Sequence, residues 1–178
     1  MNGLGEVPKQ SLLAWARHCL VRHLIRTESP STPPDFDLKA GVFVTLTRAG
    51  QLRGCIGRVE PQRPVVSLIQ EMVISAATRD PRFPPVVREE LEELRVEISL
   101  LGALEECSLD EVVVGVHGLT VDVDGKRGLL LPQVAIERAW SVEEFLKATC
   151  RKAGVDEAEL RRRGRLQRFC GLHFSEDQ

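Results

Sequence analysis

The sequence predicts a single domain that combines α-helices with antiparallel β-hairpins, and three observations lead to this expectation. The chain has 178 residues, a length that suits one domain and allows it to bury a substantial core. Residues 42–57 and 112–132 each hold apolar runs separated by a turn signal, which is typical of a hairpin. Apolar residues at helical spacing precede the first hairpin and follow both.

The first predicted helix spans residues 9–26. Its apolar positions recur every three or four residues, at Leu13, Ala16, Leu20 and Leu24. Cys19 and His23 lie one turn apart in this helix and could share a metal ion. Two ligands without visible partners make a weak site, so a core cysteine beside a rim histidine is the preferred interpretation.

The hairpin 42–57 follows a proline-rich connector, residues 29–37, which is expected to be extended. Residues 42–46 alternate in the manner of a strand, and Ala49-Gly50 supplies the turn.

Arg53 and Cys55 are two residues apart in the second arm, so in a regular strand they share one face, and Leu52 and Ile56 share the other. A guanidinium beside a thiol favours the thiolate, which is the form that attacks electrophiles. The alternative is a cysteine that acts only as a small apolar core residue.

Gly54 and Gly57 bracket Cys55. Glycine adds no contacts to a strand and increases its entropic cost, so two glycines here indicate that something approaches the backbone closely.

A second helix is expected after Pro64 and should end at Asp80-Pro81, because the residue before a proline avoids helical backbone angles. Its apolar stripe consists of Leu68, Met72 and Ala76. Residues 89–94 are predicted to form a short helix whose glutamates, Glu90 among them, face solvent. Residues 95–100 alternate as a half-buried strand.

The segment 79–85 carries Arg79, Asp80 and Arg82 on a backbone stiffened by three prolines. Such a loop holds charged groups in place at little further entropic cost, which suits an anionic or carboxylate-bearing ligand. The alternative is a loop that pairs its own charges.

The second hairpin has residues 112–123 as its first arm and Asp124-Gly125 as its turn. His117 lies where a side chain could point into a cleft. It is therefore the strongest candidate for a general base among the four histidines, although a purely structural role is the alternative.

Residues 141–144 match a helix capping box, and this helix is expected to run to Ala153 with the next residue, a glycine, as its left-handed cap. The basic run 161–165 could contact phosphates or form a solvated helix end. Phe169 and Phe174 are assigned to a final strand.

Composition excludes several classes of function. With 24 basic and 26 acidic side chains, the net charge of -2 gives no general attraction to nucleic acid or anionic membranes. No apolar run approaches the roughly 20 residues that span a bilayer, and no secretory signal is recognised, so a cytoplasmic protein is expected. The five cysteines are irregularly spaced and are expected to be reduced thiols. No dinucleotide-binding, phosphate-binding or metal-binding motif occurs, so no cofactor and no metal are predicted.

Five motifs, in order along nearly the whole chain, resemble those of the AMMECR domain family, whose bacterial members are called AmmeMemoRadiSam system protein A. The motifs are Leu52-Arg53-Gly54-Cys55-Ile56-Gly57 (LRGCIG) and residues 79–85, 96–101, 117–119 and 130–135. The first of these is the hallmark of the family.

This resemblance implies one α+β domain over residues 1–178 with two lobes, each an antiparallel sheet flanked by helices. The N- and C-terminal segments would form the larger lobe and a middle segment the smaller. Cys55 would lie at the cleft between the lobes, within reach of Arg53 or His117. The resemblance also implies a genomic association with a Memo-like protein and a radical S-adenosylmethionine protein, but no particular reaction.

Two functions remain open. In the favoured one, the cleft binds a large ligand, such as a protein, a modified peptide or RNA. The ligand-binding residues would be Arg53, Gly54, Gly57, Arg79, Asp80 and Arg82. In the alternative, the chain is an enzyme that uses Cys55 as nucleophile or covalent carrier and His117 as base, on an anionic substrate or a modified peptide.

Overall fold

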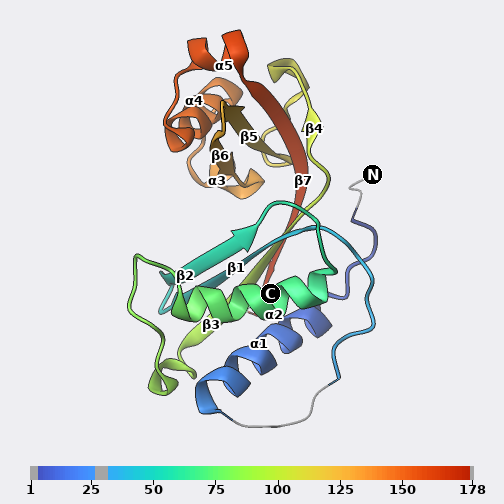
Figure 1. Ribbon diagram of the computed structural model, residues 1–178, viewed down its shortest axis with the longest axis vertical. Helices are drawn as coiled ribbons and strands as arrows, with labels where there is room; N and C mark the ends of the chain where they lie inside the picture. Colours follow the sequence, from blue (N-terminus) through green and yellow to red (C-terminus); the bar gives the residue numbers. More distant parts are fainter. Residues whose placement is uncertain (1–3, 27–31, 177–178) are drawn as a thin grey trace. The chain divides into compact units, whose positions relative to one another are not determined.

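The structure is a computed structural model that describes residues 4–26 and 32–176 (Figure 1). The fold separates into two compact units. Of the described residues, the larger unit contains 4–101 and 172–176, and the smaller unit contains Gly102–Gly171.

The larger unit is built on an antiparallel sheet in the strand order β2-β1-β3. Its strands are β1 (Gly41–Arg48), β2 (Gln51–Arg58), β3 (Leu94–Leu101) and, beside β3, the last residues of β7 (Arg165–Ser175). Its helices are α1 (Lys9–Ile25) and α2 (Val65–Thr78). Helix α2 packs on β1 and β2, and α1 packs on α2 and β3 (Figure 1).

The core of the larger unit lies between this sheet and the two helices. Alternate strand residues are completely buried there: Val42, Val44 and Leu46 of β1, and Val96, Ile98 and Leu100 of β3. The residues between them lie on the opposite face of the sheet, because successive side chains of a strand alternate. Thr45 is on this second face, half-buried.

The smaller unit has a second antiparallel sheet, in the order β6-β5-β7, with β4 paired to β7. The remaining strands are β4 (Glu105–Glu106), β5 (His117–Val123) and β6 (Lys126–Leu130), and the helices are α3 (Pro132–Glu137), α4 (Val142–Ala153) and α5 (Glu157–Arg163). Helix α4 packs on β5 and β6 through the fully buried Phe145. Strand β7 contributes residues to both units.

The predicted fold class, α+β with antiparallel sheets, is confirmed, as are both hairpins and the helices α1, α2 and α4. The capping box at Ser141 and the left-handed Gly154 are present as predicted. Residues 29–31 of the predicted connector lie outside the described residues.

Three local predictions were wrong. The strand predicted from residue 112 begins only at His117, because Val113 to His117 close a turn through backbone hydrogen bonds. The short helix predicted over 89–94 is a single 3-10 turn, Arg88–Glu90, and Glu90 is buried rather than solvated.

The third error concerns the faces of β2. The register places Gly54 opposite Leu46 and Leu52 opposite Thr47, so Arg53 is the extra residue of a β-bulge. One inserted residue reverses the alternation beyond it, so Leu52 lies on the face of Cys55 and not on the face of Ile56.

No helix in the part of the chain that the structure describes is long and apolar enough to cross a membrane. All five cysteines are free thiols.

Candidate functional site

Cys55 is held by its neighbours on both sides of β2. It pairs with Thr45 across the hairpin, and the Thr45 hydroxyl donates a hydrogen bond to Sγ of Cys55 at 3.2 Å. Its backbone N–H donates to Oδ2 of Asp80 at 2.8 Å. The thiol is half-buried, and the backbone N–H of the same residue, at the edge of β2, is occupied by the Asp80 carboxylate.

Asp80 is the centre of this arrangement and is only 4% exposed. It follows α2 in the chain and accepts three hydrogen bonds from Arg82, two from the guanidinium at 2.9 and 2.7 Å and one from the backbone N–H at 3.1 Å. These bonds from Arg82, with the N–H of Cys55, hold the pKa of the Asp80 carboxyl well below its ordinary value despite burial. We call Thr45, Cys55, Asp80 and Arg82 the Cys55 cluster.

Arg82 is the outward part of this cluster. Its side chain is 54% exposed, and its guanidinium lies 5.5 Å from the centre of the Phe83 ring. The pKa of Arg82 is raised, chiefly by the hydrogen bond to Asp80. Arg82 is thus linked to Cys55 through a shared partner, because Asp80 accepts from the Cys55 N–H and from the Arg82 guanidinium.

Arg53 has a different role from the one that the sequence suggested. Its guanidinium donates to both carboxylate oxygens of Glu90, at 2.7 and 2.9 Å, and to the carbonyl oxygen of Pro84 at 2.9 Å. The same carboxylate accepts from the N–H of Val87. The hydrogen bond from Arg53 is the main reason that the pKa of Glu90 is lowered.

The two glycines of the motif have packing reasons. A Cβ at Gly54 would lie 2.1 Å from the carbonyl oxygen of Ala76 in α2, and one at Gly57 would lie 2.3 Å from the ring of Phe43. Neither position can take a Cβ unless its neighbour moves. The close approach that the sequence predicted is thus made by the chain itself, and ligand contacts of these glycines stay a prediction.

The structure brings Cys55, Asp80 and Arg82 together and leaves Arg79 on the surface of the same loop. His117 belongs to the smaller unit, so its pairing with Cys55 stays a prediction. Nδ1 of His117 accepts from the N–H of Val113 at 3.0 Å, and burial lowers its pKa.

Sequence reasoning missed Thr45 and Glu90. Glu90 stands among four exposed-looking glutamates, and only its contact with Arg53 distinguishes it. Within the described residues, no group of three or more histidine, cysteine, aspartate or glutamate side chains is placed to hold a metal ion. Cys19 and His23 lie beside each other at a small surface pocket without a third ligand among the described residues.

Known proteins share this sequence and fold over almost their whole length. A protein from Methanothermobacter thermautotrophicus is 43% identical over 180 residues, which covers 94% of each chain. A protein from Methanosarcina mazei is 41% identical over 188 residues, which covers 98% of this chain and 94% of that one. The crystal structure of an uncharacterised protein from Pyrococcus horikoshii has a TM-score of 0.84 and 36% identity, and covers 95% of this chain and 91% of that chain.

The family model for AMMECR1 matches residues 13–174, a range that includes every member of the Cys55 cluster and His117. The match agrees with the resemblance carried by the LRGCIG motif. This chain belongs to the AMMECR1 family.

Proposed function

We propose that this chain is a binding or accessory protein that acts with a Memo-like protein and a radical S-adenosylmethionine protein, and that Cys55 is not a nucleophile. The observation that carries the proposal is the set of hydrogen bonds that the Arg53 guanidinium makes. Glu90 compensates its charge by accepting two of its N–H groups, and a third N–H donates to the Pro84 carbonyl. Arg53 therefore fastens β2 to the loop after α2 instead of activating the thiol. The choice of partners rests on family membership and the resemblance to the bacterial proteins.

The proposed binding surface is the loop formed by residues 79–88 together with the neighbouring turn of the β1-β2 hairpin. Asp80 and Glu90 hold the loop against β2 through their hydrogen bonds to Cys55 and Arg53. The loop therefore loses little conformational entropy when it binds a partner. Its outward side chains include the cations Arg79, Arg82 and Arg88.

Two apolar side chains are also exposed here, Leu52 at 42% and Val87 at 52%. Cations beside exposed apolar groups suit an acidic protein segment that also carries an apolar side chain. RNA is the weaker occupant, because the loop offers one aromatic ring, Phe83, and the whole chain carries a net charge of -2.

Binding can be tested with purified Memo-like and radical S-adenosylmethionine proteins from the same organism. The double variant Arg79→Glu with Arg88→Glu should weaken binding by about 10-fold, because charge reversal slows association and repels an acidic segment. The matched control is Arg138→Glu with Arg162→Glu, two exposed arginines of the smaller unit, which should bind as the wild type does. Equal binding by both double variants, or binding of single-stranded RNA in place of either protein, would overturn the proposal.

The enzyme alternative is tested by thiol labelling. We expect iodoacetamide to label Cys55 slowly at pH 7 and the Arg53→Met variant to be labelled no more slowly. Cys55→Ser should keep partner binding. Rapid labelling of the wild type that falls severalfold in Arg53→Met would instead show that the arginine activates a nucleophile.

A further inference from the structure

Strand β2 is an outer strand of its sheet, because the strand order begins with β2 and ends with β6 (Figure 1). Its inner neighbour is β1, and no strand of the described residues pairs with its other edge. Backbone N–H and C=O groups on an unpaired edge are a template for another strand. The outer edge of β2 is therefore a place where an extended chain can be added.

Cys55 and Gly57 direct their backbone groups to this outer edge. The Cys55 N–H points away from β1, because it donates to Asp80 and not to the paired Thr45. The direction alternates along an antiparallel strand, so Gly57 points the same way as Cys55. Beyond this edge, the described residues supply no hydrogen-bond partner to the Cys55 C=O or to the N–H and C=O of Gly57.

Asp80 sets one end of the unpaired edge. Its buried carboxylate accepts the Cys55 N–H at 2.8 Å, in the place where an added strand would put a carbonyl oxygen. The N–H is the single backbone donor of Cys55. An added strand can therefore pair with Gly57 and with the Cys55 C=O, but not with the Cys55 N–H.

Cations lie at both ends of this edge. Next to Gly57, the exposed Arg58 pairs with Glu71, and the exposed Arg63 pairs with the same carboxylate. Beside Asp80, the exposed Arg79 has no ion pair with any described residue. Positive charge is in excess at each end, which suits an acidic segment. It disfavours a second copy of this chain, since its β2 would bring the same cations to the same edge.

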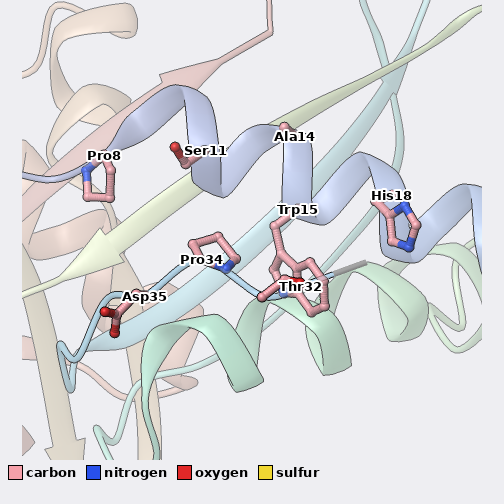
Figure 2. A pocket seen from close by; sticks show the side chains of 8 residues that line it. All are labelled: Pro8, Ser11, Ala14, Trp15, His18, Thr32, Pro34 and Asp35. Carbon is pink, nitrogen blue, oxygen red and sulfur yellow. The ribbon is translucent and has the colours of Figure 1, made fainter. Parts of the chain in front are cut away.

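The edge of β2 also differs from a site for a small molecule, which is typically concave. The pocket of about 460 Å³ in Figure 2 is lined by residues between 8 and 18 and between 32 and 35. None of these residues belongs to β2 or to loop 79–88. An extended chain needs no such cavity, because it binds through the backbone groups of the strand edge.

We propose that the partner protein adds an extended acidic segment, as a further β-strand, to the outer edge of β2 at Gly57. This mode of binding rests on the proposed function. Backbone hydrogen bonds to Gly57 and to the Cys55 C=O supply affinity, and Arg58 and Arg79 select acidic side chains. Loop 79–88 lies beside the added strand and contributes its cations to the same partner.

Amide hydrogen exchange of the full chain, labelled with nitrogen-15, tests the added strand. The unlabelled partner is the purified Memo-like or radical S-adenosylmethionine protein. The Gly57 amide should exchange rapidly in the free chain and at least about 10-fold more slowly in the saturated complex, because an added strand accepts its N–H. Intermolecular nuclear Overhauser effects from the Gly57 amide proton to backbone protons of the partner should accompany the slowing.

The matched control is the amide of Leu129, which points to the outer edge of β6, the other edge strand, and should exchange at the same rate with and without partner. Partner binding without the slowing or without the Overhauser effects at Gly57 overturns strand addition and leaves the proposed function standing. Absence of binding to both proteins overturns both. Slow Gly57 exchange in the free chain also overturns strand addition, and sedimentation equilibrium then shows whether a second copy occupies the edge.

Discussion

Asp80 joins β2 to the loop after α2 through one buried carboxylate, which accepts from the backbone N–H groups of Cys55 and Arg82. Its titration should be visible in the stability of the fold. Its pKa is lower in the folded chain than in the unfolded chain, where an aspartate has a pKa of about 4. Its contribution is therefore fully present above about pH 4 and is lost as the pH falls below that value toward the folded-state pKa. At pH 7, Asp80→Asn should lower the free energy of unfolding by about 2 kcal/mol, because hydrogen bonds to a charged acceptor are lost.

Urea denaturation between pH 2 and pH 7 measures both effects. The wild type should lose stability more steeply below pH 4 than Asp80→Asn does. Asp37→Asn, at an exposed position, serves as the control and should follow the wild type. Parallel curves for Asp80→Asn and the wild type would contradict this prediction.

Gly54 and Gly57 should differ in their tolerance of a methyl group. At Gly54 the obstacle is the backbone carbonyl of Ala76, which cannot move without displacing α2. At Gly57 it is the side chain of Phe43, which is half-buried and can rotate away. Gly54→Ala should therefore cost about 2 to 3 kcal/mol in thermal or urea unfolding, and Gly57→Ala about 1 kcal/mol. Equal losses of stability in the two variants would show that α2 can move to accommodate the methyl group at position 54.

At the residue scale the sequence singled out Cys55, Asp80 and Arg82 by their unusual local contexts of glycine and proline, and the structure brings these three residues together. Their roles in binding or catalysis stay predictions. The sequence did not show which side chains these and the neighbouring residues contact. Whether Arg53 contacts Cys55 or Glu90 depends on the β-bulge in β2 and on the path of the chain after α2, and the spacing of residues near Arg53 determines neither.

Helix α4 shows how strongly a local signal can define an element. Ser141 accepts a hydrogen bond from the N–H of Glu144 at 3.2 Å, and Glu144 accepts from the N–H of Ser141 at 2.8 Å. Both bonds connect residues three apart, so the pattern was readable in the sequence. The burial of Glu90 in the 3-10 turn Arg88–Glu90 was not, because it depends on the distant Arg53. The turn at 113–117 was missed for another reason: its apolar residues continue the pattern of the strand, although backbone hydrogen bonds close it locally.

Replacing Ser141 by alanine should destabilise the chain by about 1 kcal/mol, since the first turn of α4 loses its side-chain acceptor. Glu143→Gln, in the same turn but outside the capping box, is the matched control and should change the free energy of unfolding by less than about 0.5 kcal/mol. Urea unfolding followed by circular dichroism measures both. A Ser141→Ala variant as stable as the control would show that the cap contributes nothing.

For the molecule as a whole, two buried thiols report on the two units separately. Cys19 lies in the larger unit and Cys150 in the smaller, at 5% and 2% exposure. Burial raises the pKa of Cys19 to about 11 and also raises that of Cys150, so both react slowly while the fold is closed. Because β7 belongs to both units, we expect them to lose structure together, and the two thiols should become reactive at the same urea concentration.

Pulse labelling across a urea gradient, read by peptide mass spectrometry, gives the two midpoints. Full denaturation without reductant should expose five modifiable thiols, since all the cysteines are free. Midpoints that differ beyond error would mean that one unit unfolds while the other persists.

The division of the larger unit between two stretches of sequence has a consequence for the order in which the chain can fold during synthesis. Residues 4–101 leave the ribosome first, but Leu172–Ser175, which pair with β3, are made only after the whole smaller unit. Glu176 follows them, and its carboxylate accepts from the guanidinium of Arg17 and from the N–H of Val96. Until then the outer edge of β3 presents unpaired backbone groups to other nascent chains. Synthesis of the larger unit begins before that of the smaller unit and ends after it. The incomplete larger unit is therefore most prone to aggregation while the smaller unit is being synthesised.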